Sequence, residues 1–186
     1  KAKEMKCIEI SEPGDPDVLV LNSRPIPVTK PGEVLVKVNA ARVNGPDLVQ
    51  RKGLYPAPKG ASDLLGLEVA GTIEAVGEGV VNWLPGDAIC GLTNGGGYAE
   101  YVAINAGHCL PIPDGMSFIE AASLPETYFT IWSNIFMTAG LCAGEIYLVH
   151  GGAGGLGTTS IQIAKAFGAS VIATDSPYER CILCNE

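Results

Sequence analysis

Residues 149–157 read Val-His-Gly-Gly-Ala-Gly-Gly-Leu-Gly and overlap the end of the short apolar run Ile146–Val149. A helical pattern follows over Thr158–Phe167, and Gly168 stands where a left-handed residue commonly ends a helix. A strand, a glycine-rich turn and a helix in this order form the arrangement that binds a dinucleotide diphosphate. We therefore predict a nucleotide-binding turn in this part of the chain.

A second apolar run, Val171–Thr174, follows this helix and ends at Asp175, 18 residues after Gly157 (175 − 157 = 18). An acid about 20 residues beyond the glycine motif commonly binds a ribose hydroxyl of the nucleotide. The pattern thus predicts a ribose ligand at Asp175. The residues predicted to surround the diphosphate are Gly151, Gly152, Gly154, Gly155, Leu156 and Gly157.

The composition narrows the function classes. The 186 residues carry a formal net charge of −8, which repels nucleic acid and anionic membranes, so we expect neither as a partner. No apolar run approaches the roughly 18 residues of a membrane span, and Lys1–Ile10 lacks the apolar core of a signal peptide, so we expect a cytoplasmic protein. Only Cys181-x-x-Cys184 has a suggestive spacing, and nothing nearby completes a metal site, which favours two reduced thiols on one helix face.

Residues 1–125 have the pattern of a β-rich domain, and residues 126–186 that of an α/β unit. A capping box, Ser117-x-x-Glu120, predicts the start of a short helix, and a longer helix is expected over about 128–138. The expected strands are Val18–Leu21, Val34–Val38, Val69–Val76 with a break at Gly71, Ala88–Cys90 and Tyr98–Val102.

A doubly wound dinucleotide domain needs about six strands. Residues 126–186 supply two strands and the start of a second helix, so we predict the first, incomplete part of such a domain. We accordingly expect the 186 residues to belong to a longer protein and to be inactive alone.

Several separated strings now resemble one family. They include Val43-Asn44-Gly45-Pro46-Asp47, Gly66-Leu67-Glu68-Val69-Ala70-Gly71, Pro85-Gly86-Asp87 and Gly96-Gly97-Tyr98-Ala99-Glu100-Tyr101. In this order they resemble the medium-chain dehydrogenase/reductase superfamily, specifically its zinc-independent NADPH:quinone oxidoreductase branch. The resemblance implies an α/β plus β fold, in which a chaperonin-10-like catalytic domain (1–125) precedes a partial Rossmann domain (126–186). It also implies a quinone or conjugated enone as substrate and a homodimer as the full-length assembly.

The resemblance assigns roles to three further residues. Asn44 and Tyr55 match catalytic positions: the Asn44 amide could donate to a quinone oxygen or to the nicotinamide ribose, and the Tyr55 hydroxyl to the substrate oxygen. Thr130 matches a position near the nicotinamide. From the residues alone, Asn44 also fits a local turn, Tyr55 an aromatic in a loop, and Thr130 a hydroxyl bonded to its own helix. In zinc-dependent members, ligands fall at the positions of Asn44 and Leu67 and near Glu126. Because asparagine and leucine do not hold zinc there, we predict no metal.

The sequence leaves alternatives open for the cofactor and for the activity. The resemblance implies NADP(H), and Arg180 could pair with a 2′-phosphate beside Ser176. Asp175 is instead typical of NAD(H) enzymes, because an ionised acid repels that phosphate. We expect NADP(H), with NAD(H) as the alternative. Besides a reductase, the sequence allows a non-catalytic, crystallin-like protein that binds NADPH.

Overall fold

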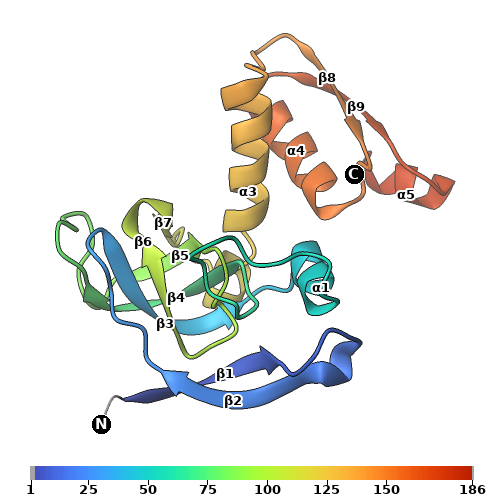
Figure 1. Cartoon of the computed structure of the whole chain (residues 1–186). Coiled ribbons are helices and arrows are strands. Elements are labelled where there is room, and N and C mark those ends of the chain that lie inside the picture. The colour runs from blue at the N-terminus through green and yellow to red at the C-terminus, as the bar shows by residue number, and fades with distance from the viewer. Residues whose placement is uncertain (1–2, 186) are drawn as a thin grey trace. The chain divides into compact units, whose positions relative to one another are not determined.

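The computed structural model describes residues 3–185 (Figure 1). The chain divides into two compact units, residues 1–125 and residues 126–186. Within the described residues, no helix combines the length and the apolar character that crossing a membrane requires.

The first unit is built on an antiparallel five-stranded sheet in the order β6-β3-β4-β5-β7 (Figure 1). The predicted break of the strand Val69–Val76 at Gly71 is wrong, because β4 runs continuously through that residue. A Cβ on Gly71 would lie 2.1 Å from the Lys37 carbonyl oxygen, so glycine there permits close strand pairing. The strands are β3 (Glu33–Ala41), β4 (Glu68–Val76), β5 (Ala88–Leu92), β6 (Tyr101–Asn105) and β7 (Cys109–Pro111).

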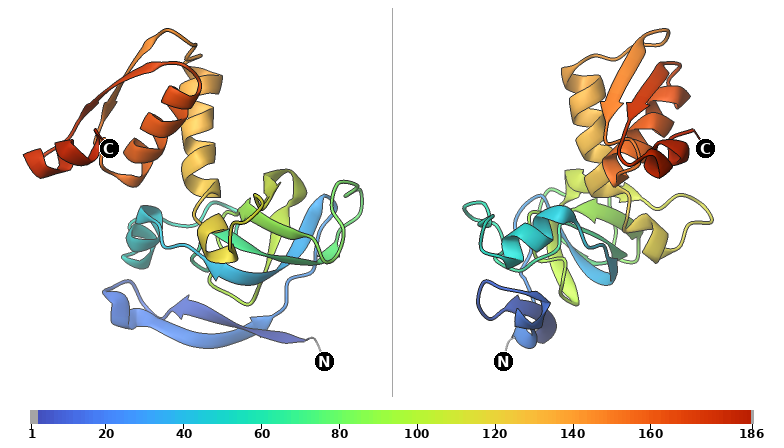
Figure 2. Two further views of the ribbon diagram at one scale, coloured as in Figure 1. Left: turned by 180° about the vertical axis from the view of Figure 1, so that it is seen from behind. Right: turned by 90° about the vertical axis from the view of Figure 1, so that its right-hand side faces the viewer.

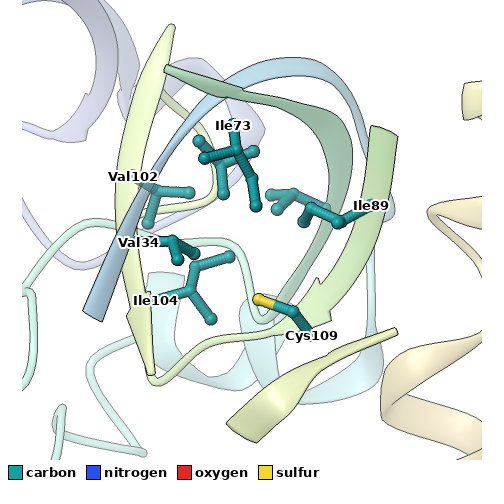
Figure 3. Packing of buried hydrophobic residues seen from close by; sticks show 8 residues of the cluster. Val34, Ile73, Ile89, Val102, Ile104 and Cys109 are labelled. Atoms are coloured by element: carbon teal, nitrogen blue, oxygen red, sulfur yellow. The ribbon is translucent and has the colours of Figure 1, made fainter. Parts of the chain in front are cut away.

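The core of this unit lies inside the curled sheet, where side chains from all five strands converge (Figure 3). Along β3, β4 and β6 they alternate with residues on the opposite side of the sheet, where Ala70 and Cys90 form a second buried cluster with Ala121 and Ala122. Two bulges in the β3–β4 pair, at Leu35/Val36 and Val38/Ala40, shift the register within that pair. The buried cluster consists of Val34, Val36, Val69, Ile73, Ile89, Val102, Ile104 and Cys109.

A hairpin of β1 (Glu4–Ile10) and β2 (Leu19–Pro25) precedes the sheet (blue in Figure 1). Strand β1 was not predicted, although Met5 and Cys7 alternate with exposed residues. The amide of Ile8 donates to the Tyr98 carbonyl oxygen at 2.8 Å, which attaches the hairpin to the segment before β6. Between the two strands, Pro16–Val18 forms one 3₁₀ turn.

Short helices complete the first unit. Helix α1 (Gly45–Arg51) was not predicted, and α2 (Phe118–Ala121) starts at the predicted capping box. In that box the amide of Ser117 donates to Glu120 at 2.8 Å, and the amide of Glu120 donates to the Ser117 hydroxyl at 3.3 Å. One 3₁₀ turn, Ala106–His108, joins β6 to β7.

The second unit contains the predicted strand–helix–strand arrangement. Strands β8 (Ile146–His150) and β9 (Ser170–Thr174) are parallel, and α4 (Gly155–Ala166) connects them along one face (Figures 1 and 2). Helix α4 begins three residues before the predicted Thr158, so Gly155 and Gly157 belong to its first turn. Helix α5 (Tyr178–Leu183) follows β9.

Helix α3 (Pro125–Ile131) continues as a π-helical segment over Trp132–Thr138. The predicted helix of 128–138 is therefore longer at its start and more widely wound at its end. The ring of Phe167, just after α4, lies 5.6 Å from that of Trp132 and 5.0 Å from that of Phe136. These contacts pack the π-helical segment against the end of α4.

Candidate dinucleotide and substrate site

The glycine turn uses most of its own amides to hold its shape. The amides of Gly151 and Gly152 donate to the Thr174 carbonyl oxygen at 2.8 and 3.0 Å, and Gly154 donates to Gly151 at 3.0 Å. Gly151 has a φ of +74°, which favours glycine. The first helical bond of α4 runs from Thr158 to the Gly154 carbonyl oxygen. The amides of residues 155–157 therefore precede the helical ladder, where an anion finds donors.

Two glycines have no room for a side chain. A Cβ on Gly157 would lie 2.2 Å from the Gly151 carbonyl oxygen, and one on Gly152 would lie 2.8 Å from the Ala173 Cβ. The first contact brings the helix against the turn, and the second brings the turn against β9. The backbone of the turn thus packs on the start of α4 and on β9 with no space for a side chain between them. A diphosphate-binding turn requires packing of this kind.

A hollow of about 610 Å³ lies over the start of α4. Thr130 lines it together with part of the turn and with His150, whose Nδ1 lies 2.7 Å from the Thr174 hydroxyl. Of the predicted cofactor residues, the structure places Thr130, Gly151, Gly154, Gly155, Leu156 and Gly157 around this hollow.

Asp175 has four hydrogen-bond donors around its carboxylate. Arg180 donates from Nε to Oδ1 at 2.8 Å and from Nη2 to Oδ2 at 3.2 Å. The amides of Ala153 and Ser176 donate at 2.8 and 2.7 Å. The Arg180 bonds, followed by these amides, hold the pKa of Asp175 far below its usual range. The side chain of Asp175 is 7% exposed and braces the glycine turn through Ala153.

In the first unit, Asn44 caps the start of α1 and is held at two points. Its amide nitrogen Nδ2 donates to Glu68 Oε1 at 2.9 Å, and its backbone amide donates to Asp47 Oδ2 at 2.8 Å. Asp47 also accepts from the Gly66 amide at 3.1 Å and from the Tyr98 hydroxyl at 3.1 Å. Asp47 therefore has a structural role, because it accepts hydrogen bonds from three separate segments of the first unit.

Tyr55 follows α1 in a loop and is 48% exposed. Asn44 and Tyr55 belong to the first unit, whereas Thr130, Ser176 and the glycine turn belong to the second. Burial of the Tyr98 hydroxyl, reinforced by the nearby charge of Asp47, raises the pKa of Tyr98 well above its usual value. Tyr98 is therefore a hydrogen-bond donor at neutral pH.

Sequence reasoning missed Glu68, which is fully buried at the start of β4. A signal was present, because a single acid stands inside the apolar string Leu67-Glu68-Val69-Ala70. Such an acid is almost never buried without a partner, which predicts a pairing but does not name the partner. Asn134 and Ser160, which line the hollow, carried no comparable signal.

Metal ligands need to converge in a set. Across residues 3–185, no three side chains of the His, Cys, Asp or Glu type gather into a group that could hold an ion. The groups that bond to Asn44 are the carboxylates of Glu68 and Asp47, and Arg42 Nη1 lies 3.7 Å from Glu68 Oε1.

Comparison with known proteins shows which class of enzyme the chain resembles. Residues 30–114 match the alcohol dehydrogenase GroES-like domain. With the β-rich sheet and the glycine turn already described, this match makes the chain similar to enzymes of the medium-chain dehydrogenase/reductase superfamily.

Individual proteins of this class are similar to the chain over most of its length. The chain is 38% identical to the quinone oxidoreductase of Rattus norvegicus over 174 residues, which is 92% of this chain and 53% of that protein. It therefore spans about half the length of this relative. Quinone oxidoreductase from Coxiella burnetii superposes with a TM-score of 0.81 at 33% identity, covering 97% of this chain and 59% of that one. The CurK enoyl reductase gives 0.82 at 34% identity, with 97% and 57% covered.

Proposed function

We propose that the protein carrying this chain is an NAD(P)H-dependent oxidoreductase that reduces a quinone or a conjugated enone without a metal. The observation that carries the proposal is the start of α4. There Gly157 packs on the Gly151 carbonyl oxygen, and three helical amides precede the first helical bond. A diphosphate fits this arrangement, because its oxygens accept from backbone amides that have no helical partner. The similarity to a quinone oxidoreductase and to an enoyl reductase supports the proposed chemistry.

When bound, the nicotinamide supplies the hydride. The chain's task is to orient the acceptor and to stabilise the charge that develops on its oxygen. We assign that task to the Asn44 amide and to the Tyr55 hydroxyl, both of which can donate. Quinones and enones suit such donors, since they delocalise the incoming charge onto an oxygen. An isolated carbonyl needs stronger polarisation, of the kind a zinc ion provides.

We assign Thr130 to the nicotinamide end of the hollow, because it lines the same wall as the start of α4. A dinucleotide that places its diphosphate on residues 155–157 would run past this wall. The Thr130 hydroxyl would then be available to the nicotinamide portion of the cofactor.

For the adenosine end we propose NADP(H). Arg180 is 44% exposed in its side chain and binds Asp175 edge-on through Nε and Nη2. The remaining N–H groups of this guanidinium can meet a 2′-phosphate, with Ser176 beside it. Arg180 neutralises the charge of Asp175, and two backbone amides also donate to its carboxylate. The repulsion that this acid would exert on a 2′-phosphate is therefore offset.

The activity is tested by mixing the protein with NADPH or NADH and a benzoquinone, and by following nicotinamide absorbance. We expect steady oxidation of NADPH that is faster than that of NADH. Binding of NADPH, seen as a change in its fluorescence, without oxidation of either cofactor would favour the crystallin-like alternative. Failure to bind either cofactor would refute both functions. Light scattering tests the expected homodimer.

The cofactor choice is tested with R180A. Removing the guanidinium leaves Asp175 charged beside the 2′-phosphate, so KM for NADPH should rise about tenfold while KM for NADH stays the same or falls. Lys165, an exposed cation at the end of α4, gives the matched control K165A. Equal effects of R180A and K165A on the NADPH-to-NADH ratio would contradict the assignment.

A further inference from the structure

Glu68 is the most completely buried carboxylate among the polar groups around Asn44, with 0% of its side chain exposed. Its Oε1 accepts from Asn44 Nδ2 at 2.9 Å and lies 3.7 Å from Arg42 Nη1. Arg42 also donates from Nη1 to the Ser123 carbonyl oxygen at 2.9 Å. A buried carboxylate destabilises a fold unless it is paired and hydrogen-bonded, so the neighbouring cation favours the ionised form of Glu68.

An ionised carboxylate only accepts hydrogen bonds, whereas an asparagine amide has a donating and an accepting end. Glu68 therefore selects the nitrogen end of the Asn44 side chain and excludes the flipped orientation. Asp47 fixes the same residue from the other side through its backbone amide. An amide nitrogen carries two N–H groups in one plane, so the bond to Glu68 also sets the direction of the second.

We infer that Glu68 is a positioning residue: it acts through Asn44, whose second N–H it keeps aimed at the oxygen of the bound substrate. This inference rests on the proposed function, in which Asn44 donates to that oxygen. Glu68 itself does not touch substrate. Its effect is to remove the rotational freedom that a solvent-exposed amide would have to lose during the reaction.

A purely structural role would have a different signature. Glu68 could serve only to bind Arg42 and so to hold the segment before α1. Its removal would then weaken the fold and reduce activity by a factor that does not depend on the side chain at position 44. Positioning predicts the opposite, because a residue that acts through Asn44 has nothing left to do once that amide is gone.

The experiment is a double-mutant cycle on kcat with E68Q, N44A and the double variant, in the protein that carries this chain. The new amide of E68Q offers Asn44 both a donor and an acceptor, so both Asn44 orientations become compatible. We expect kcat to fall about tenfold in E68Q and about 100-fold in N44A. The double variant should match N44A within about twofold. Glu74, exposed on the same strand β4, gives the control E74Q, which should retain wild-type kcat.

Two further measurements separate positioning from damage to the fold. The NADPH dissociation constant of E68Q should stay within about twofold of wild type, and circular dichroism should show an intact fold. E68D keeps the charge but shortens the side chain, and we expect its kcat to lie between E68Q and wild type. Loss of folding in both E68Q and E68D would make the role structural and overturn the inference.

The outcomes also separate this inference from the proposed function. If wild type reduces quinone while E68Q equals wild type, or if the two effects multiply in the double variant, only the positioning role fails. If wild type oxidises neither NADPH nor NADH, both the function and the positioning role fail.

Discussion

Replacing Gly157 with alanine tests the packing of the glycine turn directly. The added Cβ would lie 2.2 Å from the Gly151 carbonyl oxygen and 2.6 Å from that of Gly152. Carbon–oxygen contacts are usually about 3.3 Å or longer, so the start of α4 must move by about 1 Å. Overpacking of this kind costs about 3 kcal/mol, and alanine returns about 1 kcal/mol of helix propensity. We therefore expect G157A to lose about 2 kcal/mol of unfolding free energy.

The same displacement moves the amides that we assign to the diphosphate. Loss of one hydrogen bond to a charged group weakens binding by about 1.5 kcal/mol, which is about tenfold in the dissociation constant. Urea unfolding and NADPH fluorescence titration measure the two effects. G154A is the matched control, because its Cβ would lie 3.2 Å from the same Gly151 oxygen, a tight but tolerable contact. If G157A were as stable as G154A and bound NADPH as well, the packing argument would be refuted.

Three further predictions concern buried and paired groups. Removing the Asp47 carboxylate leaves three hydrogen-bond donors without their acceptor, so D47A should lose about 3–5 kcal/mol of unfolding free energy, as measured by urea unfolding. The exposed control D114A should change the unfolding free energy by under about 0.5 kcal/mol. Burial raises the pKa of the Cys109 thiol to about 12, so a thiol reagent should modify exposed Cys142 first and reach Cys109 only after unfolding. Because the folded-state pKa of Asp175 is depressed, its stabilisation is present at neutral pH and is lost as pH falls below about 4. The stability gap between wild type and D175N should narrow in acid, and a gap that widens there would contradict this sign.

The glycine turn could be predicted from sequence because its constraints are local. The contact that requires glycine at position 157 is with Gly151, so it lies within a segment of seven residues. The strands before and after the turn and its helix are apolar in sequence. The start of α4 was misplaced because glycine is a poor helix former, and propensity alone put the boundary at Thr158. Tertiary packing decided otherwise, since the missing Cβ of Gly157 lets the first helical turn approach the preceding backbone.

Helix α1 was missed for a related reason. Asn44-Gly45-Pro46-Asp47 contains residues that are typical of turns and equally typical of a helix start, and the two cannot be told apart locally. What distinguishes them is distant, because Asp47 accepts hydrogen bonds from Gly66 and Tyr98 as well as from Asn44. The pairing of Asn44 with Glu68 spans 24 residues and could not be read from either string alone.

The acidic side chains of the candidate site act mainly as braces. Asp47 and Glu68 hold Asn44, and Asp175 holds the glycine turn, each by accepting from amide N–H groups. Each of these charges is therefore engaged by donors and contributes little repulsion toward a bound anion. A chain of net charge −8 can in this way present a diphosphate with the amides at the start of α4 and, at its adenosine end, the guanidinium of Arg180. Net charge argues against a polyanionic partner, but it does not determine affinity for a single dinucleotide, because that depends on charges within one Debye length of the site.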